Sequence, residues 1–132
     1  MIEFRGAAGR RRSDGRKRVT MDVRNAMFLS MSVVEMLGSP EAVTFHYDPH
    51  KQIIGLTPAD PRRPNAFPLK QSERFRVRLI QARPFCKHFD IKVLRTISFN
   101  TIEIDPETGT LLLDLTDITY SGREPGSRKE KV

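Results

Sequence analysis

The chain has 132 residues, of which 38% are hydrophobic, and it carries a net charge of +7 with an isoelectric point near 10.1. This length suits one domain or two small repeats that share a core. No apolar run approaches the roughly 18 residues that a transmembrane helix needs, so no membrane partner is expected. The N-terminus has no apolar signal region and Cys86 has no second cysteine to pair with. We therefore expect a cytoplasmic protein.

The excess positive charge lies at the two ends of the chain. Residues 1–18 hold seven Arg or Lys against two acids, and residues 121–132 hold four against two. The 102 residues between them balance at twelve against twelve. The ends contain little apolar sequence, so we expect a disordered basic arm over 1–17 and a disordered tail over 121–132.

The first half of the core predicts two strands, a short helix and a hairpin. Order should begin near Arg18, and a second strand over 26–30 follows a break at Asn25, a residue type that tolerates the left-handed conformation of a tight turn. Beyond the helix, apolar and polar residues alternate from Val43 to Tyr47, as in a half-buried strand. Residues 52–57 return as its hairpin partner.

The helix between these strands has sequence signals at both ends. Ser30 or Ser32 can cap the helix, Ser32 and Glu35 have the spacing of a capping box, and Gly38 should end the helix. Cap and stop signals this close together predict a helix of only a few residues.

The same order of elements recurs beyond a proline-rich connector over 58–64. The expected elements are strands over 66–69 and 75–80, a short helix from Pro84, a strand over 95–104 with a bulge between Phe99 and Ile102, and a return strand over 110–115. We therefore predict a mainly β core over 18–120 with two short helices, built as tandem repeats 18–57 and 65–117. A single continuous β-barrel or sandwich is the open alternative.

The run from Asp22 through Val-Arg-Asn-Ala-Met-Phe-Leu-Ser, then a helix ending Leu37-Gly38 and a hairpin, resembles the AbrB/MraZ swapped-hairpin family of bacterial DNA-binding proteins. The core of that family reads Asp, two residues, Gly-Arg, three apolar residues, Pro, a helix ending Leu-Gly and a hairpin. The match covers residues 18–58, with a weaker echo over 65–117. Asn25, Ala26 and Ser30 replace the glycine, the basic residue and the proline of the family pattern.

This resemblance implies a pseudo-dimeric, swapped-hairpin-like barrel and a non-enzymatic transcriptional regulator that binds double-stranded DNA. It leaves open whether the repeats pair within one chain or between chains of a homodimer. Two alternatives remain: an antitoxin-like module that binds a protein partner through its tail, and a Whirly-type binder of single-stranded nucleic acid, which usually places its helices after four strands.

Residues 74–79 alternate arginine with apolar residues. In a strand, Arg74, Arg76 and Arg78 form a row with a spacing of about 6–7 Å, while Phe75, Val77 and Leu79 face the core. That spacing is close to the phosphate spacing of a nucleic-acid strand. The alternative is a solvated face whose arginines pair with acids on neighbouring strands.

Other basic residues can extend this surface. Arg83 and Lys87 lie four apart on the second predicted helix. The basic arm can bind any polyanion by counterion release, and the open alternative is a tail that only improves solubility. The complete predicted nucleic-acid-binding set is Arg24, Arg74, Arg76, Arg78, Arg83, Lys87, Arg10, Arg11 and Arg12.

No pattern in the chain predicts catalysis, a cofactor or a metal. His46, Asp48 and His50 do not share one strand face, and Cys86 beside Phe85 is most simply a core thiol. Six phenylalanines fall at apolar positions and are assigned to the core: Phe28, Phe45, Phe75, Phe85, Phe89 and Phe99. This assignment argues against a sheet that stacks bases on outward aromatic rings.

Overall fold

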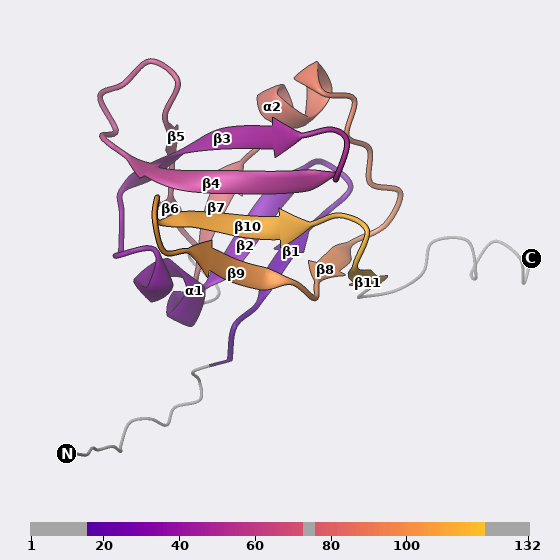
Figure 1. Cartoon of the computed structure of the whole chain (residues 1–132), viewed down its shortest axis with the longest axis horizontal. Helices are drawn as coiled ribbons and strands as arrows, with labels where there is room; N and C mark the ends of the chain where they lie inside the picture. The colour runs from indigo at the N-terminus through magenta and orange to yellow at the C-terminus, as the bar shows by residue number, and fades with distance from the viewer. Residues whose placement is uncertain (1–15, 73–75, 121–132) are drawn as a thin grey trace, which may run out of the picture.

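Two antiparallel sheets and two short helices make up the described part of the chain, residues 16–72 and 76–120, in this computed structural model (Figure 1). The elements are β1 Val19–Met21, β2 Ala26–Ser30, α1 Met31–Met36, β3 Ala42–Asp48, β4 Ile53–Ala59, β5 Phe67–Pro68, β6 Lys70–Gln71, β7 Val77–Gln81, α2 Arg83–His88, β8 Ile97–Phe99, β9 Ile102–Asp105, β10 Thr110–Asp114 and β11 Ile118–Tyr120. No helix among these residues is long and apolar enough to cross a membrane.

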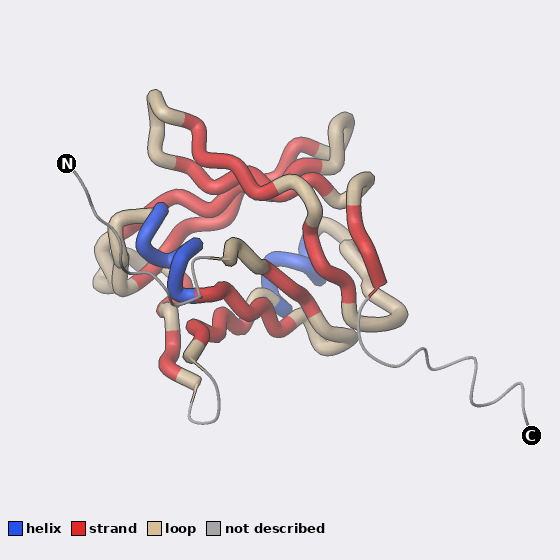
Figure 2. Tube along the Cα trace, turned by 90° about the horizontal axis from the view of Figure 1, so that it is seen from below, coloured by secondary structure: helices blue, strands red, loops and turns tan. Residues whose placement is uncertain are grey.

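The first sheet has six strands in the order β11-β8-β1-β2-β7-β6, and the second has five in the order β5-β3-β4-β10-β9. The expected mainly β class with two short helices is confirmed, while the described sheets are open and do not close into a barrel. The helices lie apart, at different ends of the sheets (Figure 1, Figure 2).

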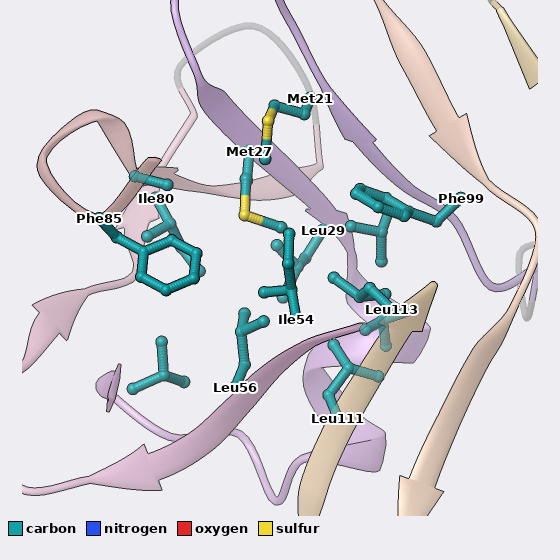
Figure 3. Close-up of a cluster of buried hydrophobic side chains, with 14 of the residues drawn as sticks. Met21, Met27, Leu29, Ile54, Leu56, Ile80, Phe85, Phe99, Leu111 and Leu113 are labelled. Carbon is teal, nitrogen blue, oxygen red and sulfur yellow. The ribbon is translucent and has the colours of Figure 1, made fainter. Parts of the chain in front are cut away.

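The core lies between the two sheets and is filled by aliphatic and sulfur-containing side chains (Figure 3). Met27 and Leu29 of β2 and Ile80 of β7 are fully buried, as are Ile54 of β4 and Leu111 of β10. Full burial of one such side chain stabilises the fold by about 1.5–3 kcal/mol. Phe85 of α2 joins this core and stacks on Phe45 of β3, with ring centroids 4.6 Å apart.

The pairing of β2 with β7 joins the two halves of the chain and corrects the predicted orientation of β7. Phe28 lies opposite Leu79, and Leu29 lies opposite Arg78. Because Leu29 and Ile80 are buried, Arg78 is on the core-side face of its strand and Leu79 is on the outer face. The expectation that Val77 and Leu79 face the core is therefore wrong.

This error has a simple physical cause. A strand alternates its side chains, so an error of one residue in phase moves every side chain to the other face. The fully buried Ile80 and Ala82, which come just before α2, set the phase of β7. Phe28 was also assigned wrongly, because it lies half-buried on the outer face beside Leu79.

The start of α1 differs from the predicted capping box. Ser30 is the N-cap residue, but no side chain donates or accepts a capping hydrogen bond there. Instead, the Ser32 hydroxyl donates to the carbonyl oxygen of Arg16 at 2.7 Å, and the Arg18 N–H donates to Ser30 Oγ at 3.0 Å. These bonds tie the segment before β1 to the helix. The predicted helix end is confirmed, since Gly38 has φ of +88°.

The strand predicted over 95–104 is two strands in two different sheets. β8 pairs with β1 in the six-stranded sheet, whereas β9 pairs with β10 in the five-stranded sheet. The phase shift between Phe99 and Ile102 therefore marks a crossing between sheets, and the predicted bulge is wrong. The alternating pattern could not distinguish a bulge from a crossing, because both change which residues face the core.

We expect Ile80→Ala to lower the free energy of unfolding by about 2–5 kcal/mol, the usual cost of truncating a buried aliphatic side chain. Leu79→Ala should cost less than half as much, because Leu79 lies half-buried on the outer face. Urea unfolding of the two variants tests this comparison. A larger loss for Leu79→Ala would contradict the orientation of β7.

Candidate nucleic-acid interface

A hollow of about 250 Å³ lies between the β1–β2 turn and α2, and most of its charged side chains are basic. It is lined by Val23, Arg24, Asn25, Arg83, Cys86, Lys87, Asp90, Ile91 and Lys92. Four bases thus face one acid around a single depression. We call this site the basic hollow.

A rigid turn presents Arg24 to the basic hollow. Asp22 Oδ1 accepts hydrogen bonds from the N–H groups of Arg24 at 2.9 Å and Ala26 at 3.0 Å. Asn25 adopts the left-handed conformation, with φ of +63°, as expected from the sequence. The Arg24 side chain is 81% exposed, and its guanidinium lies 3.8 Å from the carboxylate of Asp22, whose side chain is 19% exposed. Because the arginine is solvated and the distance is long, this ion pair is weak.

Helix α2 is fixed to this same turn. The N–H of Ala82 donates to the carbonyl oxygen of Asn25 at 3.1 Å, so the first turn of α2 starts next to Arg24. Pro84 lies in that first turn, where its missing N–H costs no helical hydrogen bond. Arg83 and Lys87 are four residues apart, share one side of the helix and are exposed.

Lys92 completes the basic hollow and was not predicted. The chain reverses after α2 because Asp90 has φ of +57° and the N–H of Ile91 donates to the carbonyl oxygen of Cys86 at 2.8 Å. This reversal brings Lys92 back beside the helix, where Nζ lies 3.6 Å from Asp90 Oδ1. The sequence did not identify it, because a left-handed aspartate is uncommon even though aspartate adopts this conformation more often than most residues.

The buried thiol beside the basic hollow offers no nucleophile. Cys86 is fully buried, and desolvation raises its pKa from the ordinary 9.0 to about 11. A thiol with that pKa stays protonated near neutral pH, and a nucleophilic cysteine must be a thiolate. Within residues 16–72 and 76–120, no three His, Cys, Asp or Glu side chains are grouped to hold a metal ion.

The predicted binding residues separate into two groups along β7. Arg24, Arg83 and Lys87 come together in the basic hollow. Arg76 and Arg78 lie toward the other end of β7, and residues 78 and 83 are about 16 Å apart along the chain at strand spacing. The predicted continuous arginine surface is therefore two surfaces. Arg10, Arg11, Arg12 and Arg74 lie outside the described residues.

We found no relative of this chain among known proteins. No protein-family model, curated protein or solved structure matches this chain. The basic hollow must therefore be interpreted from its own residues.

The buried Cys86 predicts a defined pH dependence of stability. The folded protein holds the thiol proton more tightly than the unfolded chain does. The buried neutral thiol is therefore compatible with full stability below about pH 9, and the free energy of unfolding falls as the pH rises toward about 11. A Cys86→Ala variant lacks this loss. Relative to this variant, the free energy of unfolding of the wild type should fall by about 2 kcal/mol between about pH 8 and pH 11.

Iodoacetamide gives an independent check of the same thiol. Folded protein at about pH 8 should be alkylated only slowly, and urea-unfolded protein quickly. Rapid labelling of the folded protein would show an accessible thiolate and contradict the burial of Cys86.

Proposed function

We propose that the protein is a non-enzymatic DNA-binding protein of the transcriptional-regulator class and that it holds phosphates of double-stranded DNA in the basic hollow. The observation that carries this proposal is the convergence of Arg24, Arg83, Lys87 and Lys92 around one depression. These four bases come from a turn, a helix and the segment after that helix.

The chemistry of the basic hollow suits phosphate. Arginine offers a planar fork of donors that matches phosphate oxygens, and lysine supplies a compact charge. With four bases against Asp90, the lining has a net charge of +3, which attracts a polyanion over the range of a Debye length. Phosphate contacts of this kind supply affinity and orientation without reading the base sequence.

The finer proposal for the fold is a tandem repeat of the AbrB/MraZ type that pairs within one chain. In each half, a strand pair leads to a short helix and then a hairpin: β1, β2, α1, β3–β4 and β6, β7, α2, β9–β10. β2 pairs with β7 and β4 pairs with β10, which supports an approximate two-fold relation between the halves. β5, β8 and β11 are additions to this pattern.

The position of α1 bears on one alternative. A Whirly-type sheet places its helices after four strands, whereas α1 follows β2 directly. This order favours duplex binding over that alternative. The tail invoked for an antitoxin-like partner binder, residues 121–132, lies outside the described residues.

We expect the triple variant Arg24→Ala, Arg83→Ala, Lys87→Ala to bind a fluorescein-labelled DNA duplex at least ten-fold more weakly than the full wild-type chain. Each lost phosphate contact should also lower the slope of log affinity against log salt by about one, or by about three in total. Fluorescence anisotropy across a salt series measures both quantities.

A charge-matched control comes from bases outside the basic hollow. The triple variant Lys51→Ala, Arg62→Ala, Arg63→Ala removes the same charge from exposed loops flanking β4. It should retain most of the wild-type affinity and slope. Equal losses in the two triple variants would show that only net charge matters, and the basic hollow would not be the binding site.

A further inference from the structure

A second hollow, of about 260 Å³, lies on the outer face of the six-stranded sheet, on the side opposite the core. Arg18, Thr20, Phe28, Ser30 and Val77 line it, and its surface is predominantly apolar. An apolar depression rimmed by polar side chains on the solvent side of a sheet is a candidate interaction site. We call it the outer hollow.

The strand register explains why a depression forms there. Thr20 lies opposite Phe28, and Ser30 lies opposite Val77. Phe28 is large, whereas its neighbours Thr20, Ser30 and Val77 are short, so the space beside the Phe28 ring stays open. Leu79, opposite Phe28, continues the apolar surface onto β7.

The surroundings of the outer hollow are basic. Residues 16–20, 26–30, 70–72 and 76–79 cover most of β1 and β7 and all of β2 and β6, and they contain no acid. Asp22 and Glu73 are in the connections between these strands. The six bases of these residues are Arg16, Lys17, Arg18, Lys70, Arg76 and Arg78, of which Arg78 lies on the core-side face of β7. Arg18 itself lines the outer hollow, and the exposed Lys70 lies opposite Leu79.

Size and chemistry narrow the class of occupant. The volume falls below the range of about 300–1,000 Å³ that is typical of small-molecule sites, but it can take one or two apolar side chains. A sugar-phosphate backbone would leave the apolar lining without a partner. A single half-buried ring, Phe28, is a poor platform for consecutive stacked bases.

We propose that the outer hollow docks an acidic segment of a partner protein, inserting a leucine or phenylalanine side chain beside Phe28 while neighbouring carboxylates face Arg18 and Lys70. Charge complementarity selects this partner, because Arg18 in the lining and Lys70 beside Leu79 are both basic. The inference is independent of DNA binding at the basic hollow.

The test uses fluorescein-labelled heptapeptides in which Asp and Glu flank a central Leu, Phe or Val, and it uses the full chain. At least one peptide should bind in fluorescence anisotropy and shift the amide resonances of residues 18–20, 28–30 and 77–79. Replacing the central residue by Ser, or all acids by Lys, should weaken binding at least five-fold.

Two variants locate the binding. Val77→Thr keeps the shape of the side chain and places a hydroxyl in the outer hollow. Arg18→Gln removes the positive charge of the Arg18 side chain. Each should weaken peptide binding at least three-fold with little change in Tm. The controls Leu94→Thr, at an 85% exposed position, and Lys51→Gln should bind as the wild type does.

The proposal is overturned if none of the peptides shifts these resonances at millimolar concentration, or if Val77→Thr and Arg18→Gln bind as tightly as the controls. It is also overturned if a thymidine oligonucleotide, rather than any peptide, binds in a way that these two variants abolish. That outcome would assign the outer hollow to single-stranded nucleic acid.

Discussion

The antiparallel pairing of β2 with β7 is the contact on which the rest of this structure depends. It joins the first half of the chain to the second, with Phe28 opposite Leu79 at its centre. At one end of this pair the Ala82 N–H reaches the carbonyl oxygen of Asn25, which brings α2 to the β1–β2 turn. At the other end, Val77 lies opposite Ser30 and helps to form the outer hollow. One register therefore positions both candidate surfaces.

The same pairing shows which features the sequence could predict. The strand over Ala26–Ser30, the turn at Asn25 and the helix end at Gly38 were predicted correctly, because each depends on a few neighbouring residues. The face of β7 was not, because Val77 and Leu79 are as apolar as Ile80 and only tertiary pairing decides which of them is buried. The crossing from β8 to β9 failed for the same reason.

The basic hollow was also only partly predictable from the sequence. Arg83 and Lys87 could be grouped from their helical spacing alone. The turn residue Arg24 was predicted as a binding residue within the run that resembles the AbrB/MraZ family. Their convergence depends on the hydrogen bond between Ala82 and Asn25, which links residues far apart in sequence. Lys92 joins them only through the left-handed backbone at Asp90. Arg76 and Arg78 do not line the basic hollow, because they lie at the end of β7 away from α2.

The two hollows differ in chemistry in a way that suits two different partners. The basic hollow has polar and charged walls and a positive balance, whereas the outer hollow has apolar walls inside a basic rim. Both border the β2·β7 pair, but they lie at its opposite ends.

The most direct test of the central claim is an NMR titration of the full-length, isotope-labelled chain with a short DNA duplex. We predict that the largest amide shifts fall at Arg24, Asn25, Arg83, Lys87 and Lys92, the residues around the basic hollow. Shifts confined to residues 1–15 and 121–132 would contradict this account. They would show that the duplex binds only the basic ends of the chain and that the basic hollow has no part in it.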